Sequence, residues 1–424
     1  MQYQRTLGPL QGMAMTVTTF VGTGLMILPA MSVAQAGSFA FYAWLITATI
    51  IVPVAFVFAF LGGRFPSAGG ASHYIGKVLG KKAERAVGWL FLSILFVGPA
   101  VAIKVAAAYL AVLFNLTENS VFLLSVITLI GMLLFSIAGM KNSANFQTGV
   151  VVCLISTILA LFILSGAPFS SNIINRPQSW PELETTLLAT GTIFWCFLGI
   201  EVMAHMGAEF KNPSRDFPIA LLGGIALVVM LYLATVLMIA EYKVYGNEFT
   251  NSQSLALLVG SLLGEEARRW FALGAYIIAF SNVGTYILGF ARMVQSMASQ
   301  RAIPQYFNIL SNKGTPIRAV SLVGLACLLS LLLVEFFGTQ MEWLIEMTNG
   351  AFLLIYTLTC ITAIKSLESR FRWVAVLATF SCLMMIAFIG QNMLFAVLVF
   401  VLAFAWESLK IQNPPMPEDK IHVQ

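Results

Sequence analysis

The chain has very few charged residues for its length. Only 10% of its 424 residues are Asp, Glu, Lys or Arg, against roughly 25% in soluble domains. No charged residue occurs between Arg5 and Arg64, a gap long enough for two membrane spans of about 20 residues each. A soluble enzyme and a disordered chain are therefore excluded. A nucleic-acid-binding protein is excluded as well, because the basic residues behind the net charge of +5 are spread through loops.

Cysteine, histidine and aspartate are also scarce. The five cysteines lie in apolar stretches without a C-x-x-C pair, and the three histidines are far apart. We therefore expect no disulfide frame, no metal site and no cofactor. The only aspartates are Asp216 and Asp419, and no clustered acid, base or nucleophile is visible, which disfavours a membrane enzyme. A channel is disfavoured too, because no rings of repeated polar groups occur.

Long apolar runs fill most of the chain, in which 59% of residues are hydrophobic. Runs of about 20 mostly apolar residues predict an all-α integral membrane protein with twelve transmembrane helices. The predicted spans are 10–35, 39–61, 84–114, 120–138, 144–166, 184–208, 217–241, 267–299, 317–337, 342–364, 373–390 and 392–409.

The basic residues predict the orientation of these spans. With the N-terminus inside, 18 of the 23 Lys and Arg residues fall on the cytoplasmic side and 4 on the outer side, while Lys104 lies within a span. The positive-inside rule then places both termini in the cytoplasm. Residues 1–10 lack the features of a cleaved signal peptide, so the first span should be retained. The proline-containing tail, 411–424, is expected to be mobile.

Two predicted spans carry glycines near their centres: Gly22 and Gly24 in the first, and Gly199 in the sixth. Glycine lets a helix unwind, which frees backbone N–H groups and carbonyls. Freed N–H groups suit a carboxylate and freed carbonyls suit an ammonium group, so together they suit an amino acid. A lone pair of glycines would more often serve only close helix packing. Two breaks five spans apart instead match a 5+5 inverted repeat.

Four motifs in the expected order resemble the amino acid–polyamine–organocation family of transporters, with the fold named after the bacterial leucine transporter. They are Gly22-Thr23-Gly24 followed by Pro29, Arg64–Gly70 followed by Tyr74, Phe197–Glu201, and Glu209–Pro218. The resemblance covers nearly the whole chain. It implies one transmembrane domain, 1–424, with repeats at 8–166 and 183–364 and two added helices at 372–410, which would offer a packing or homodimer surface.

The resemblance also implies a substrate site. Thr23 and Gly24, beside Gly22, would bind the substrate carboxylate. The carbonyls of Phe20, Trp195 and Leu198, next to Gly199, would receive the ammonium group, and the Trp195 ring would cover the substrate side chain. The remaining pocket candidates are Asn282, Tyr286 and Asn349, for which hydrogen bonding between helices is an equal alternative.

Four ionisable residues are candidates for proton coupling. Glu201 is a carboxylate at mid-membrane depth, where a charge is costly and a residue is either neutralised or functional. His205 and Glu209 follow at intervals of four and would share a helical face with it, although Glu209 could instead pair within its loop. Lys104 lies too deep to reach the surface easily and should face a cavity or a carboxylate, with Glu201 a candidate partner. The fifth span lacks the lysine found in many relatives, so Lys104 or Arg292 would have to supply that charge.

Further residues, including Phe194–Glu201 and Tyr286 with Phe290–Arg292, resemble the branch of the family that exports methionine and branched-chain amino acids. The resemblance implies proton antiport of methionine, leucine, isoleucine and valine across a bacterial inner membrane. The expected partners are these amino acids, protons and the lipid bilayer, without nucleic acid. A proton-coupled importer or an exchanger with the same fold remains an alternative, because the residues do not reveal the direction of transport.

Overall fold

The structure of the protein, a computed structural model, describes residues 7–66, 70–138, 144–166, 174–207, 210–311 and 315–412. Among these residues no β-strand is found, and a single backbone bridge joins Leu7 and Phe210. The α-helices are α1 (Pro9–Val21), α2 (Gly24–Ala36), α3 (Ala40–Arg64), α4 (Gly70–Leu79), α5 (Lys81–Ser93), α6 (Gly98–Leu113), α7 (Val121–Ala138), α8 (Ala144–Leu164), α9 (Trp180–Ile193), α10 (Ile200–His205), α11 (Pro213–Tyr242), α12 (Glu248–Ser252), α13 (Ser254–Leu263), α14 (Glu265–Ser299), α15 (Ile317–Phe337), α16 (Met341–Ser366), α17 (Arg372–Ile389) and α18 (Met393–Gln412).

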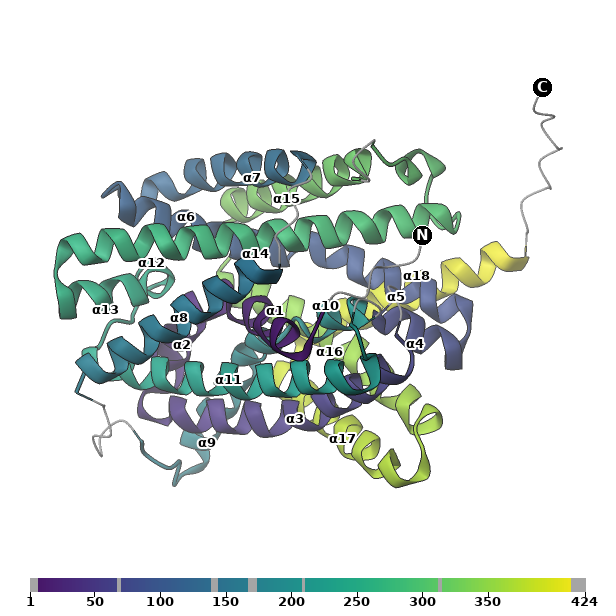
Figure 1. Cartoon of the computed structure of the whole chain (residues 1–424), viewed down its shortest axis with the longest axis horizontal. Coiled ribbons are helices and arrows are strands. Elements are labelled where there is room, and N and C mark those ends of the chain that lie inside the picture. Colours follow the sequence, from purple (N-terminus) through teal and green to yellow (C-terminus); the bar gives the residue numbers. More distant parts are fainter. Residues whose placement is uncertain are drawn as a thin grey trace.

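The helices have the length and composition of membrane spans. Within the described ranges, nine helical stretches are long and apolar enough to cross a membrane. Two of these, Gly24–Arg64 and Ser369–Leu409, each contain 41 residues and join two consecutive predicted spans. Each of the twelve predicted ranges is mostly helical within the described residues, while the number of membrane crossings stays a prediction. The long helices α3, α11 and α14 run nearly along the longest axis of the molecule (Figure 1).

Both predicted helix breaks are present. The first helical run stops at Val21 and resumes at Gly24, with Gly22 in a non-helical conformation. The second passes from α9 through a 3₁₀ turn, Phe194–Phe197, into an extended Leu198. Gly199 then adopts a φ of +130°, which a residue with a side chain rarely takes, and α10 begins at the next residue.

A third interruption was not predicted. The predicted span 84–114 is divided into α5, a 3₁₀ turn at Ile94–Phe96, and α6. Pro99 explains the division, because it has no backbone N–H to donate and its ring clashes with the preceding turn of a helix. Within this division, the carbonyl of Phe96 accepts a hydrogen bond from Ser330 Oγ at 2.9 Å. The short helices α4, α12 and α13 were not predicted either.

Glycines allow the helices around the first break to pack closely. A Cβ at Gly224 of α11 would lie 2.5 Å from Cβ of Thr16 in α1, and one at Gly62 of α3 would lie 2.4 Å from the Phe217 ring. Small residues at such crossings let helix backbones approach each other, as is common in membrane proteins. The close packing holds α1, α3 and α11 together.

Candidate functional site

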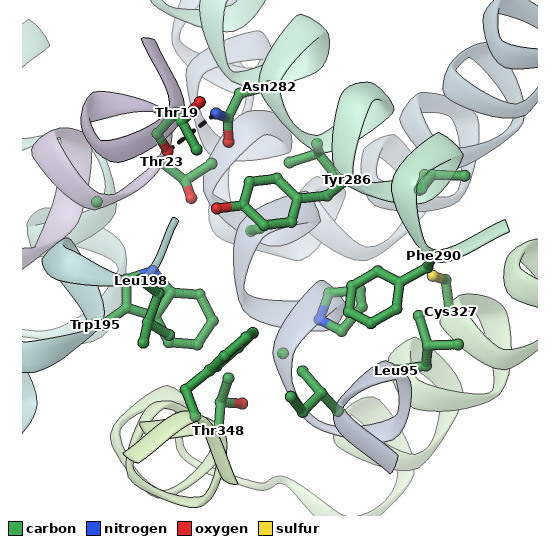
Figure 2. A pocket seen from close by; sticks show the side chains of 18 of the residues that line it. Thr19, Thr23, Leu95, Trp195, Leu198, Asn282, Tyr286, Phe290, Cys327 and Thr348 are labelled. Atoms are coloured by element: carbon green, nitrogen blue, oxygen red, sulfur yellow. Dashed lines mark hydrogen bonds between the residues drawn. The ribbon is translucent and has the colours of Figure 1, made fainter. Parts of the chain in front are cut away.

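A pocket with about 680 Å³ of empty space lies between the two helix breaks and helices α6, α14, α15 and α16 (Figure 2). Seven of the ten predicted substrate residues line it: Phe20, Thr23, Gly24, Trp195, Leu198, Asn282 and Tyr286. Gly22 and Gly199 form the breaks themselves.

One end of the pocket is polar. Thr23 precedes α2, whose first backbone N–H groups have no partner within the helix. The helix start and the Thr23 hydroxyl together offer donors to an anion, as the sequence predicted for a carboxylate. The hydroxyls of Thr23 and Tyr286 point toward each other across this end, close to Asn282 (Figure 2).

The other end is apolar. Leu95, Phe290 and Cys327 come from three different helical runs and gather there (Figure 2). Ile94 and Phe352 extend the same surface. None of the described residues that line the pocket carries a formal charge. The pocket therefore offers donors and dipoles at one end and an uncharged, mostly apolar surface at the other.

Two of the three carbonyls predicted to receive an ammonium group, those of Phe20 and Trp195, already have one partner each. The Phe20 carbonyl accepts from the Tyr232 hydroxyl at 3.0 Å, and the Trp195 carbonyl accepts from the Leu198 N–H at 3.1 Å. A carbonyl oxygen has two lone pairs, so each can accept a second hydrogen bond. The predicted roles of Phe20, Trp195 and Leu198 stay predictions.

Glu201 lies behind the second break rather than in the pocket lining. It belongs to the first turn of α10 and is only 2% exposed. Its Oε2 accepts from the Gly199 N–H at 3.0 Å and from the hydroxyl of Tyr356. Its Oε1 has no hydrogen-bond partner in the described part of the chain. One carboxyl oxygen is thus held in place while the other remains available to a proton.

The structure pairs Lys104 with a carboxylate other than Glu201. Lys104 Nζ lies 3.6 Å from Glu248 Oε1 of α12, so Glu248 and not Glu201 is its carboxylate partner. The side chain of His205 and all of Glu209 lie outside the described residues. Arg292 is exposed on α14.

Asn349 lies outside the pocket lining, and the preceding residue, Thr348, lines the pocket instead. The Asn349 side chain is buried and donates to the carbonyls of Gly191 and Thr192, at 2.9 and 3.4 Å. It holds the end of α9 just before the second break, which agrees with the alternative of hydrogen bonding between helices.

Several residues that shape the site were missed from the sequence. Ile94, Leu95, Gly98 and Pro99 surround the third interruption and line the pocket. The adjacent Gly98 and Pro99 inside an apolar run are a signal for a helix boundary and could have revealed it. Tyr356 carries no comparable signal, because only the packing of α16 against α10 brings it to Glu201.

Two discontinuous helices that face each other across an uncharged pocket, in an all-helical chain of this hydropathy, define a membrane transporter of the leucine-transporter fold. The family model described as amino acid permease matches residues 7–418. The chain belongs to this family, and the relatives that it matches are multi-pass membrane transporters and not enzymes.

Individual relatives agree with this assignment. The chain is 32% identical to the L-methionine/branched-chain amino acid exporter YjeH of Escherichia coli (strain K12), over 97% of this chain and 98% of that protein. It is 28% identical to the uncharacterized amino acid permease YecA of Bacillus subtilis (strain 168), over 93% of each. The crystal structure of MhsT in complex with L-phenylalanine has the same fold, with a TM-score of 0.63 at 14% identity, over 94% of this chain and 99% of that one.

Proposed function

We propose that this protein exports neutral apolar L-amino acids, namely methionine, leucine, isoleucine and valine, in exchange for protons by alternating access. The observation that carries the proposal is the pocket, in which donors at the start of α2 face an uncharged surface of Leu95, Phe290 and Cys327. An amino acid with an apolar side chain matches both ends. A cationic side chain would be buried without a partner there, which is costly. The similarity to the Escherichia coli L-methionine/branched-chain amino acid exporter supports these substrates and the outward direction.

The proposal includes the architecture expected from the sequence. Twelve spans would cross a bacterial inner membrane with both termini in the cytoplasm, and the repeats 8–166 and 183–364 would be inverted relative to each other. Thr23 and Gly24 would bind the carboxylate, and carbonyls at both breaks would receive the ammonium group. Trp195 would cover the substrate side chain. A homodimer through α17 and α18 belongs to the same proposal.

Glu201 is the proposed proton carrier. Its Oε1 is buried without a hydrogen-bond partner in the described structure, whereas Oε2 is held by Gly199 and Tyr356. A carboxyl group in this position can gain or lose a proton while the break next to it changes shape. His205 and Glu209 would extend the proton path. Lys104 pairs with Glu248, so it would influence the proton path from a distance and not through contact with Glu201.

Uptake of radiolabelled methionine into inside-out membrane vesicles with an imposed pH gradient tests the proposal, because export becomes uptake in such vesicles. We expect accumulation that a protonophore abolishes. Exchange of internal for external methionine without gradient-driven accumulation would support an amino acid exchanger instead. No methionine transport of either kind would refute the substrate assignment.

A pair of glycine variants shows whether the uptake uses the proposed site. Gly24→Leu should abolish it, because a Cβ at Gly24 would already lie 2.8 Å from the Tyr232 hydroxyl and 3.3 Å from Cys196 Sγ. Gly274→Leu is the matched control, since a Cβ at Gly274 of α14 meets nothing within 4 Å. Normal uptake by Gly24→Leu would contradict the proposed carboxylate site.

A further inference from the structure

One face of α16 is polar along most of its length. Five residues follow each other there at intervals of four, three, four and three positions, so they form a single stripe along the helix. They are Glu342, Glu346, Asn349, Leu353 and Tyr356. The stripe runs for about 21 Å, at 1.5 Å per residue, from the first turn of α16 to Tyr356, whose hydroxyl donates to Glu201. Ionisable and polar groups inside a membrane protein are costly and commonly mark the path of an ion or a proton.

Buried oxygens beside this stripe lack hydrogen-bond partners. Within the part of the chain that the structure describes they include Oδ1 of Asn349, Oγ1 of Thr192 and Oε1 of Glu201. None of these three residues is more than 2% exposed. Thr192 adjoins the stripe because Nδ2 of Asn349 donates to its carbonyl at 3.4 Å. A buried oxygen without a partner costs about 1–3 kcal/mol. The structural role of Asn349 uses only its Nδ2, so it does not account for these oxygens, each of which can accept a hydrogen bond from water.

The stripe begins among charged groups. Oε2 of Glu248 accepts from the first backbone N–H of α16 at 3.4 Å, and its Oε1 lies 3.6 Å from Lys104 Nζ. Glu346 accepts a hydrogen bond from Asn392, in the turn between α17 and α18. Glu342 interacts electrostatically with both Glu248 and Glu346. This end of α16 thus carries three carboxylates and one ammonium group. In the orientation proposed above it faces the outer side, where an excess of negative charge concentrates protons.

Leu353 interrupts the stripe between Asn349 and Tyr356. It is fully buried. The two polar residues on either side of it are seven positions apart, or about 10 Å along the helix, which is too far for a direct hydrogen bond. An apolar constriction of this kind closes a path by excluding water. The face of α16 is therefore polar on both sides of one apolar level.

We propose that this face of α16 is the route by which protons from the outer side reach Glu201. A proton from the outer water binds a carboxylate at the start of the stripe and crosses through water held by Asn349 Oδ1 and the Thr192 hydroxyl. It then binds Oε1 of Glu201, whose carboxylate becomes a neutral carboxyl group. Leu353 keeps the route closed until the packing around it opens. Asn349 and Leu353 are positioning residues, since neither carries the proton. The assignment rests on the proposed exchange for protons and adds the side and the path of entry.

Proton leak through the reconstituted protein tests the route without any amino acid. Liposomes enclose a pH-sensitive dye, and a potassium diffusion potential set with valinomycin drives protons inward. Leu353→Asn should admit water at the closed level and raise the leak severalfold above that of the native protein. Leu353→Ala should act in the same direction without burying a polar group, and it replaces the Asn variant if that one does not fold.

Adding Glu346→Gln to either Leu353 variant should lower the leak again. Glutamine keeps an oxygen that can accept from Asn392, but it cannot carry a proton. Ile361→Asn is the matched control, because Ile361 is 39% exposed on another side of α16, and it should cause no leak. A leak that stays at the native rate in both Leu353 variants, or that is indifferent to Glu346, would overturn the proposal. These results stand even if methionine is not the substrate.

Two transport rates separate proton delivery from structural damage. In Glu342→Gln/Glu346→Gln, methionine uptake driven by a pH gradient should fall roughly a hundredfold, the lower end of what a positioned proton-transfer group contributes. Exchange of methionine for methionine moves no net proton and should continue at the native rate. Equal losses of both rates, or no loss of driven uptake, would refute the route. Glu335→Gln, an exposed acid in the last turn of α15, should change neither rate. Absence of driven uptake in the native protein would contradict the proposed function, and the leak assay would still decide the route.

Discussion

Gly98 is the position at which a substitution can most directly change which substrate side chains the pocket accepts. It begins α6 at the third interruption and lines the pocket. A Cβ at this position would lie 3.4 Å from both Cγ2 and Oγ1 of Thr348, a neighbouring pocket residue on α16, and 3.3 Å from Cγ2 of Ile94. These contacts are tight without being severe clashes. Gly98→Ala should therefore fold and narrow the pocket by one methyl group.

The size of the effect follows from what one methyl group is worth in an apolar pocket. Adding or removing one changes binding by about 1–3 kcal/mol, or roughly 10–200-fold. Methionine and leucine would reach past Gly98 toward Leu95 and Phe290 and should lose this amount. Alanine is too short to meet the new methyl group and should bind as before. Competition of unlabelled amino acids with labelled methionine for the purified protein measures both changes.

The control is Gly131→Ala in α7, where the new Cβ would also be crowded, 3.2 Å from the Phe280 ring, but outside the pocket. It should leave the ratio of methionine to alanine affinity unchanged. Equal losses for methionine and alanine in Gly98→Ala, or no loss for either, would refute the reasoning, because the new methyl group would then not meet the substrate side chain.

Three further predictions follow from individual contacts. Glu201→Gln should keep methionine binding but remove the pH dependence of vesicle uptake, and retained pH dependence would discard Glu201 as the proton carrier. Trp195→Ala should weaken methionine binding by about 1–3 kcal/mol through lost apolar contact, as measured by the same competition assay; unchanged affinity would contradict its covering role. Glu407→Ala should lower the melting temperature in a reconstituted bilayer. The fully buried Glu407 pairs with Arg85 at 3.3 Å and accepts a hydrogen bond from Trp89 at 3.1 Å. Removal of one partner of a buried pair costs about 3 kcal/mol of stability. A melting temperature equal to that of the native protein would show that this contact does not stabilise the fold.

The helices and both broken spans could be predicted because their signals are local. About 20 apolar residues in a row indicate a span wherever they occur. Gly22, Gly24 and Gly199 lie inside such runs, where a glycine has a backbone consequence independent of its neighbours. The third interruption is local as well, and Pro99 was its signal. The length of the apolar run 84–114 concealed it, because the hydrophobic pattern continues through the turn.

The partners of the polar residues could not be predicted, since they depend on packing between distant segments. Glu201 meets Tyr356, which is 155 positions away, and Lys104 meets Glu248 on a short helix that no pattern indicated. Asn349 differs from the pocket residue Thr348 by one position, or about 100° around a helix. The sequence suggests that a polar residue at this level matters, but not which way its side chain points.

The hydrogen bonds at the two breaks support the proposal that the substrate is neutral. Tyr232 donates to the Phe20 carbonyl at 3.0 Å and the Leu198 N–H to the Trp195 carbonyl at 3.1 Å, while Asn282 serves the end of α1. These donors are all uncharged, and each satisfies a carbonyl that unwinding has freed. The breaks therefore present polar backbone groups that can form few further hydrogen bonds, and these groups carry no net charge. Such a site can bind the opposite charges of one zwitterion, whose net charge is zero, but it has nothing to balance an additional charge on the side chain. Lysine and arginine should accordingly fail to compete with methionine, and effective competition by either would show that a charged group enters the pocket.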